Sequence, residues 1–350
     1  MNKSSIKNKE LSRMMDTLNS APKIYAPSDY WQMLNTVHIN KLDADGFDSF
    51  KRSINKAYFN WGISGIFLHQ LQIFFSEIYR GNIWPMVKSK FIDKNFSGKV
   101  FVKFEFLSRL IYRVYVAYLY DYVSRIDRFG LLKKISEPLL GGPFLVKYRN
   151  RRISQDLCNS VYEFYSITKE INLDKKLETA EIGAGYGRLA YVFLKALPKA
   201  NYCIIDIPPA LYISQEYLRR IFPKEKIFLF RPFKNFKEIE QEFKDARIKF
   251  LLSHQIEYLP KDYFYIMINI SSLHEMRRDQ ISNYIKQENR LTRGFIYLKQ
   301  WKKARAKDNN FIREEDYPIP LKWKKIFHRT HPIQNLFFEA LYKTRSSGNI

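Results

Sequence analysis

Three glycines stand at alternate positions in residues 181–190, which read EIGAGYGRLA, although the 350-residue chain contains only 13 glycines. Glycine costs conformational entropy, so it is favoured where a side chain would obstruct a close approach to the backbone. The residues that follow, RLAYVFLKAL, have helical spacing. Gly183, Gly185 and Gly187 are therefore expected to form a turn between a short strand and a helix. Such a turn offers backbone N–H groups and the positive end of a helix to a ligand.

The spacing of these glycines separates two classes of ligand. Turns that bind dinucleotides carry G-x-G-x-x-G, but Arg188 occupies the place of the last glycine in that pattern. The alternate spacing after the acidic residue Glu181 favours S-adenosylmethionine, a cationic ligand that suits a carboxylate better than a diphosphate does. We expect Glu181, Gly183, Gly185 and Gly187 to bind this cofactor. The alternative is a turn with a purely structural role.

A carboxylate follows at the end of the next apolar run. Asp206 closes the segment NYCIIDI, 23 residues after Gly183. A carboxylate at the end of the next parallel strand can accept both hydroxyls of a ribose. We therefore expect Asp206 and its neighbour Ile207 to contact the ribose of the cofactor. The alternative is that Asp206 only caps the turn made with Pro208 and Pro209.

A histidine and a glutamate follow a third apolar run, in the segment INISSLHEM. The run ends at Asn269 or Ile270, and a helix is expected from about Arg278. Histidine is the side chain best suited to take a proton from a hydroxyl near neutral pH. We expect His274 to be the catalytic base, with Glu275 as its orienter or as an alternative base; a structural turn is the competing interpretation. The N-P-P-Y signature of amino-methylating enzymes is absent, which favours an oxygen acceptor.

Further polar residues have expected roles around the cofactor. The third strand is either KIFLF (226–230) or the start of IKFLLSHQIEYLP (248–260). The second choice would place His254 and Gln255 near the adenine. The segment RRISQDLCNSVYEF (151–164) is expected to cover the cofactor, and Arg152, Gln155 and Glu163 would reach its carboxylate or amine unless they form a solvated helix face. A metal could instead acidify the acceptor hydroxyl, but no cluster of His, Asp and Glu has the usual metal-ligand spacing, so the sequence indicates no metal site.

The elements that position these residues differ between the two parts of the chain. Residues 1–135 are expected to be mainly helical, and from about residue 177 short apolar runs alternate with amphipathic helices. This alternation predicts an α/β fold with a parallel, Rossmann-like sheet and helices on both faces. We expect a helical N-terminal region (1–135) that covers the substrate and a cofactor-binding domain (136–350), with Gly141, Gly142 and Pro143 marking the boundary. Two N-terminal helices are predicted, over residues 58–81 and 107–122, the second with an apolar face formed by Leu107, Leu110, Ile111, Val114, Tyr118 and Tyr122.

The composition and the charge bear on the partners and the cellular location of the protein. The chain is 46% hydrophobic and has a formal charge of +24. The charge would attract nucleic acid, an anionic membrane or a phosphorylated substrate, or it reflects a Lys- and Asn-rich composition alone. Basic residues form no block of five, so no nucleic-acid partner is expected. Neither a leader nor a membrane span is apparent, and the two cysteines form no disulfide framework, so we expect a cytoplasmic protein.

The segments EIGAGYGRLA, DIPPAL and NISSLHEM together resemble the class I S-adenosylmethionine-dependent methyltransferases. The chain also resembles the sugar O-methyltransferases of bacterial surface-polysaccharide gene clusters, in PSDYWQMLN, FKRSINKAYFNW, YLKQW and DYPIPLKW and in the segment 141–164. This resemblance implies methyl transfer to a hydroxyl of a sugar or polysaccharide precursor, whether free, nucleotide-linked or lipid-linked. The basic charge of the chain also suits peripheral contact with an anionic membrane. The alternatives are a methyltransferase for nucleic acid or another small molecule, a nicotinamide oxidoreductase, and a non-catalytic binding protein. Plant small-molecule O-methyltransferases carry a catalytic histidine in a similar position, followed by Asp-Trp, where this chain has Glu275 and Met276.

Overall fold

The computed structural model describes residues 8–54, 105–305 and 311–344. The helix predicted over residues 58–81 lies outside the described residues. Within the described ranges, no helix combines the length and the apolarity needed to cross a membrane.

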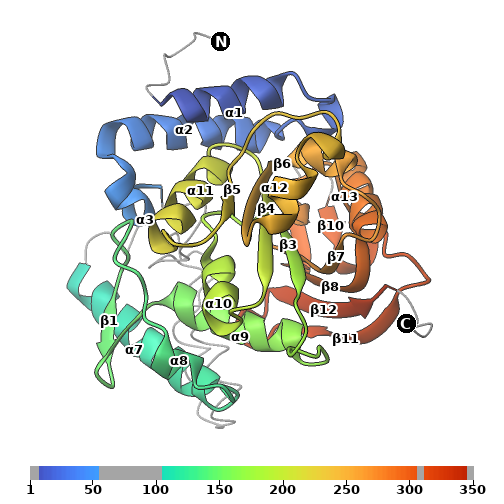
Figure 1. Cartoon of the computed structure of the whole chain (residues 1–350). Helices are drawn as coiled ribbons and strands as arrows, with labels where there is room; N and C mark the ends of the chain where they lie inside the picture. The colour runs from blue at the N-terminus through green and yellow to red at the C-terminus, as the bar shows by residue number, and fades with distance from the viewer. Residues whose placement is uncertain (1–7, 55–104, 306–310, 345–350) are drawn as a thin grey trace.

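An eight-stranded sheet forms the centre of the molecule (Figure 1). Its order is β5-β6-β4-β3-β7-β8-β12-β11, and every neighbouring pair from β5 to β8 is parallel. This confirms the predicted α/β class with a parallel, Rossmann-like core. The parallel strands are β3 (Glu178–Ile182), β4 (Asn201–Asp206), β5 (Ile227–Phe228), β6 (Ile248–Leu252), β7 (Phe264–Ile270) and β8 (Thr292–Trp301).

Two strands at one edge depart from the parallel expectation. β12 (Phe337–Lys343) runs antiparallel to β8 and also to β11 (Lys324–Thr330) at the sheet edge. β11 was not predicted, because its residues lie largely at the surface and lack an apolar run. The charged side chains of this strand suit a sheet edge, since they oppose pairing with another chain.

The strand order decides which segment is the third strand. β6 pairs directly with β4, whereas the two residues of β5 pair only with the outer side of β6. The segment that begins IKFLL therefore takes the place beside β4. On the other side of β3, the chain continues into β7, so the connections reverse direction at β3. Open α/β sheets bind ligands at the carboxyl ends of the strands at such a reversal.

Helices cover both faces of the sheet, as predicted. α9 (Gln155–Thr168), α10 (Arg188–Ala196) and α11 (Ala210–Ile221) pack with one core cluster. α12 (Glu240–Asp245) and α13 (Arg278–Leu291) pack with the other. Adjacent residues of β4 divide between the two clusters, with Ile204 in the first and Cys203 and Ile205 in the second. This division follows from the alternation of side chains along a strand.

The described N-terminal part is mainly helical, as expected. It contains α1 (Lys9–Asn19), α2 (Asp29–Asp45), α3 (Phe50–Ser53), α7 (Glu105–Ser124) and α8 (Leu131–Lys134), with 3-10 turns at Lys23–Tyr25 (η1) and Phe47–Ser49 (η2). Asn8, which caps α1, donates a hydrogen bond to the Tyr212 hydroxyl of α11 at 2.7 Å. Gln280 of α13 donates to the carbonyl oxygens of Ile24 and Ala26 around η1. Residues 8–26 therefore bridge from α11 on one face to α13 on the other.

The predicted apolar face of α7 is not the face that the helix buries. Tyr118 and Tyr122 are only partly buried, and the side chains of Leu107, Leu110 and Ile111 lie outside the described residues. Val114 is 41% exposed, and the helix buries a face that lies one residue away. That face packs toward α9 and consists of Tyr112, Tyr115, Val116, Leu119, Tyr120 and Val123. The remaining elements are two short hairpins and small turns: β1 (Val146–Tyr148) with β2 (Arg151–Ile153), β9 (Lys303–Arg305) with β10 (Phe311–Arg313), η4 (Phe236–Glu238), η5 (Ser253–Tyr258), η6 (Leu273–Glu275) and η7 (Glu314–Asp316).

Candidate active site

The glycine turn joins β3 to α10, as predicted, and all three glycines have a positive φ. A Cβ atom at Gly183 would lie 2.3 Å from the Ser272 hydroxyl oxygen, and one at Gly187 would lie 3.1 Å from carbon atoms of Ile204 and Leu218. Side chains of the protein itself therefore approach two of the glycines. Gly185 has a φ of 60°, a conformation that other residues rarely adopt.

Asp206 lies at the carboxyl end of β4, where it holds the glycine turn. Its Oδ2 accepts a hydrogen bond of 2.9 Å from the Gly185 N–H, and its Oδ1 accepts one of 2.7 Å from the Ile207 N–H. Burial raises the pKa of Asp206 to about 7, against these two bonds, which lower it. Each carboxylate oxygen can accept a second hydrogen bond, so the group can still receive ribose hydroxyls.

Glu181 is buried two residues before the first glycine. Its carboxylate accepts a hydrogen bond of 2.7 Å from the Tyr202 hydroxyl on the neighbouring strand β4. Burial raises the pKa of Glu181 to about 7. Its predicted contact with a cationic ligand stays a prediction.

One face of α9 presents amides beside the glycine turn. Gln155, Asn159 and Glu163 are spaced four residues apart, so they share this face. Glu163 accepts hydrogen bonds from Arg188, directly after the turn, at 2.5 Å and from Lys299 of β8 at 2.7 Å. Both polar side-chain atoms of Gln155 and the Oδ1 of Asn159 are buried without a hydrogen-bond partner among the described residues.

The residues expected near the carboxylate or amine of the cofactor therefore differ in their surroundings. Arg152 lies exposed on β2. Glu163 is paired with two cations, and Gln155 keeps its amide free among the described residues. Buried polar groups are rarely left unpaired, so the Gln155 amide and the Oδ1 of Asn159 suit a polar ligand.

The residues expected near the adenine follow β6 in η5. Gln255 accepts a hydrogen bond from the Leu252 N–H and donates one to the Arg231 carbonyl oxygen, each at 2.8 Å. Its amide thus closes the turn after β6. His254 is buried, and its Nδ1 has no hydrogen-bond partner among the described residues. Burial lowers the pKa of His254, so the ring is neutral near pH 7.

His274 lies in η6, directly after the turn that leaves β7. Its Nδ1 is 3.1 Å from the Oε1 of Gln300, and its Nε2 is 3.7 Å from the Oε1 of Glu275. The ring packs against those of Trp301 and Phe337, at centroid distances of 5.9 and 6.2 Å, and these two rings contact each other at 5.2 Å. The hydrogen-bond partner of the histidine is thus Gln300, while Glu275 stands beyond hydrogen-bond distance.

Burial reverses the usual order of the two pKa values. It lowers the pKa of His274 to about 4 and raises the pKa of Glu275 to about 8. The histidine is therefore unprotonated at pH 7 and the glutamic acid is largely protonated. A hydrogen bond from the Trp31 side chain favours the ionised Glu275, but by less than burial opposes it. Pairs of titratable groups whose environments push their pKa values apart are typical of acid–base sites.

Trp31 and Gln300 are parts of the site that the sequence interpretation missed. Trp31 is in the first turn of α2, where the Ser28 hydroxyl accepts a hydrogen bond of 3.4 Å from the Trp31 N–H. Gln300 is the only amide in the apolar run GFIYLKQ, and it is fully buried at the carboxyl end of β8. A buried polar residue at the end of a parallel strand is a signal that could have found it.

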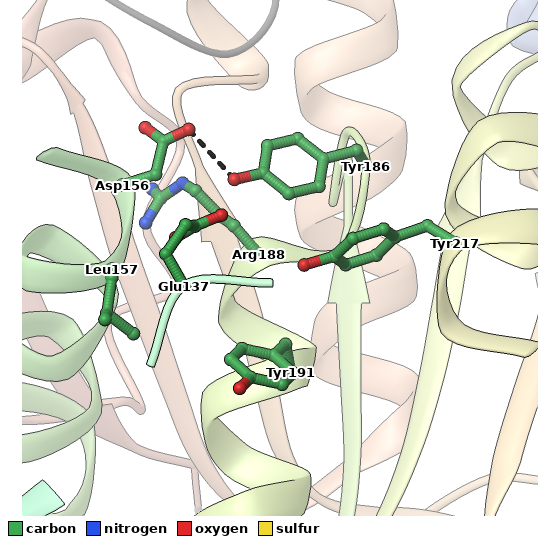
Figure 2. A pocket seen from close by; sticks show the side chains of 7 residues that line it. All are labelled: Glu137, Asp156, Leu157, Tyr186, Arg188, Tyr191 and Tyr217. Carbon is green, nitrogen blue, oxygen red and sulfur yellow. Dashed lines mark hydrogen bonds between the residues drawn. The ribbon is translucent and has the colours of Figure 1, made fainter. Parts of the chain in front are cut away.

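A second group of polar residues lines a pocket between α9, α10 and α11 (Figure 2). There Tyr186 donates a hydrogen bond of 2.9 Å to Asp156. The ammonium of Lys51, from α3, lies 2.6 Å from Glu137, and the rings of Tyr186 and Tyr217 lie within 4.7 Å of it. These contacts attach the N-terminal part of the chain to the helices of the sheet. Across the described ranges, no group of three or more His, Cys, Asp or Glu is arranged to hold a metal.

Comparisons with known proteins give distant similarities in structure only. No protein-family model matches the chain, and no curated protein does. Similar solved structures include the PH0226 protein of Pyrococcus horikoshii, with 10% identity and a TM-score of 0.38 over 53% of this chain and 89% of that one. The 1,6-didemethyltoxoflavin-N1-methyltransferase of Burkholderia thailandensis, solved with S-adenosylhomocysteine, has 11% identity and a TM-score of 0.38 over 55% of this chain and 79% of that one. An S-adenosylmethionine-dependent methyltransferase of Aquifex aeolicus has 10% identity and a TM-score of 0.33 over 64% of this chain and 98% of that one. At these identities and TM-scores, the similarity gives no information about the ligand or the substrate of this chain.

Proposed function

We propose that this protein is an S-adenosylmethionine-dependent O-methyltransferase that methylates a hydroxyl of a sugar or surface-polysaccharide precursor. The observation that carries the proposal is the joining of the glycine turn to Asp206 at the strand-order reversal, on the same sheet edge as His274. The glycine spacing favours this cofactor over a dinucleotide, as the motif analysis argued. The sugar class rests on the resemblance of the longer sequence segments.

The residues present suit the cofactor at each of its ends. Asp206 and Ile207 would hold the ribose, and His254, after β6, would lie at the adenine. Among the described residues, the amide of Gln155 and the Oδ1 of Asn159 lack a hydrogen-bond partner, and they would receive the carboxylate and amine of the methionine end. When bound, S-adenosylmethionine supplies a methyl group that its positively charged sulfur has already activated.

The chain itself has to orient the acceptor and remove a proton. The acceptor oxygen must lie about 3 Å from the methyl carbon and in line with the departing sulfur. A sugar hydroxyl is a poor nucleophile, so a base that takes its proton assists the attack. Neutral His274 would accept this proton at Nε2 while the oxygen forms its bond to carbon. Glu275 stands 3.7 Å from that nitrogen and would hydrogen-bond the acceptor.

The N-terminal part would cover the site during the reaction. It bridges α11 and α13, and the Trp31 side chain reaches Glu275. This arrangement supports the division into a covering region (1–135) and a methyltransferase domain (136–350). It also excludes bulk water from the acceptor, which strengthens electrostatic interactions in the site. A nucleotide- or lipid-linked sugar made in the cytoplasm would be the acceptor.

Two measurements, made one after the other, test the proposal. Calorimetry with S-adenosylmethionine and with NADH determines the cofactor class, and we expect binding of the first only. Transfer of a labelled methyl group is then measured with a panel of nucleotide-linked sugars, with a nucleic-acid acceptor as comparison. Binding of NADH alone would refute the cofactor, and transfer to nucleic acid without transfer to any sugar would refute the substrate class.

A further inference from the structure

We infer that Gln300 is a positioning residue that fixes His274 in its Nδ1–H tautomer and so leaves Nε2 as the proton acceptor. The inference rests on the proposed function, because a free Nε2 matters for catalysis only if His274 is the base. The tautomer itself is a property of the buried hydrogen bonds. It can therefore be tested without any acceptor or cofactor.

Two backbone groups fix the orientation of the Gln300 amide. The N–H of Ser272 can only donate, and it lies 3.2 Å from one amide atom. The carbonyl oxygen of Asn269 can only accept, and it lies 3.1 Å from the other. The atom facing Ser272 must therefore be the oxygen, and the atom facing Asn269 must be the nitrogen. Rotating the amide by 180° would oppose like groups at both contacts.

The fixed oxygen determines where His274 carries its proton. Gln300 Oε1 lies 3.1 Å from His274 Nδ1, and a carbonyl oxygen can only accept. Nδ1 must therefore hold the ring proton in the neutral histidine. The other ring nitrogen, Nε2, is left with a lone pair, on the side of the ring that faces Glu275.

A second amide and a carboxyl extend the arrangement into the core. Asn269 accepts a hydrogen bond of 2.8 Å from Gln300 Nε2 at its Oδ1, so its own amino group faces α13. There it donates a 3.1 Å hydrogen bond to Glu288. Asn269, Gln300 and Glu288 are all fully buried, which restricts their side chains to this pattern. The chain of hydrogen bonds thus joins α13, β7, β8 and the turn that carries His274.

The competing interpretation is that these amides only join β7, β8 and the turn. A structural role would stabilise the fold but would not require a particular histidine tautomer. Substitution of Gln300 by leucine removes the acceptor at similar size. Gln300→Glu keeps an oxygen facing Nδ1, and in its protonated form its hydroxyl can still donate to Asn269. Thr179→Val is a matched control, because Thr179 is also buried in the sheet and its hydroxyl has no hydrogen-bond partner among the described residues.

The experiment records ¹H–¹⁵N correlation spectra of protein labelled at its six histidines. His274→Asn identifies the signals of His274, and their pattern reports which ring nitrogen is protonated. We expect the Nδ1–H tautomer in the wild type, in Gln300→Glu and in Thr179→Val, with loss of that preference in Gln300→Leu. The Nε2–H tautomer in the wild type, or an unchanged tautomer in folded Gln300→Leu, would overturn the inference. If Gln300→Leu does not fold, the wild-type spectrum alone decides.

Turnover separates this inference from the proposed function. With an acceptor in hand, Gln300→Leu should lower kcat by about 10–10²-fold, the size of effect seen when a residue that orients a metal-bound histidine is removed, and Gln300→Glu should retain most of the wild-type kcat. The KM for the cofactor should change less than threefold. Unchanged kcat despite an altered tautomer would refute the positioning role. An Nδ1–H tautomer in a protein that methylates nothing would contradict the proposed function and leave the tautomer assignment standing.

Discussion

The N–H of Gly185 donates a 2.9 Å hydrogen bond to the carboxylate of Asp206, 21 residues later in the chain. The bond unites two sequence signals that were recognised separately, the glycine turn and the carboxylate at a strand end. Any ligand held by one of them is therefore within reach of the other. The predictions below begin with this pair.

Replacing Gly185 by valine should abolish binding of S-adenosylmethionine. The φ of 60° is strongly unfavourable for a β-branched residue, so the turn would rearrange and lose its contact with Asp206. Calorimetry measures the affinity, and circular dichroism checks the fold. Gly130→Val is the control, because Gly130 has a similar φ of 64° at the start of α8, outside the site. Unchanged affinity in a folded Gly185→Val variant would assign the turn a structural role only.

Asp206→Ala should weaken cofactor binding by about 1.5–3 kcal/mol, the usual contribution of hydrogen bonds to a charged group. Asp206→Asn should retain part of the affinity, because its side-chain oxygen can still accept one hydrogen bond. Titration calorimetry with both variants gives the two values. Equal affinities in the wild type and Asp206→Ala would contradict the ribose contact.

His274→Ala should lower turnover by about 10²–10⁴-fold, the typical share of general-base catalysis, and leave cofactor affinity within a few fold. Protonation of His274 should lower the wild-type rate as the pH drops through about 4, since burial lowers the pKa of His274 to about 4 and the protonated ring cannot accept a proton. His274 itself should contribute no inflection near the ordinary histidine pKa of about 6.5. The pH profile of kcat, with stability checked at each pH, measures this. Near-normal turnover in His274→Ala would shift the base role to Glu275.

Glu288→Gln should make the protein more stable, and increasingly so between pH 5 and 8. Burial raises the pKa of Glu288 from 4.5 to about 8 in the folded protein. Between these values the unfolded chain releases the proton and the folded chain keeps it, so stability falls as the pH rises. Glutamine preserves the hydrogen bond from Asn269 and does not titrate.

Urea unfolding of the wild type and Glu288→Gln at several pH values tests this dependence. The gain at pH 8 should be about 2–4 kcal/mol, from roughly 1.4 kcal/mol per pKa unit and some relaxation around the buried group. Gln241→Glu, which changes an exposed residue of α12, shows the effect of adding a carboxyl group at the surface. A difference between wild type and Glu288→Gln that is constant with pH would show that Glu288 ionises normally.

Lys51→Met should destabilise the protein by about 3–5 kcal/mol, because it leaves Glu137 buried without its cation. The double variant Lys51→Met/Glu137→Gln should recover much of the loss. Lys134→Met, at an exposed position of α8, should change stability by less than about 0.5 kcal/mol. Thermal and urea unfolding measure all three. If Lys51→Met is as mild as Lys134→Met, the buried pair does not attach the N-terminal part to the sheet domain.

The local sequence pattern was sufficient to predict the class of fold and most of the strands of the central sheet. The apolar runs of β3 to β8, the glycines after β3 and Asp206 after β4 are readable because strand and turn preferences act over a few residues. β11 was missed for the same reason, since its mostly exposed residues carry no apolar pattern. The side of α7 that faces α9 also depended on packing, which left Val114 exposed.

The sequence by itself determined the α/β sheet, the glycine turn and the polar residues at its carboxyl edge. Only the tertiary structure decided that Ser272 fills the space over Gly183, that β6 lies beside β4, and that Gln300 holds His274 from 26 residues away. It also decided that His274 is neutral and Glu275 protonated at pH 7, because both shifts come from burial. Residue type and spacing specify local backbone geometry. Desolvation and the choice of a hydrogen-bond partner depend on segments that meet only when the chain has folded.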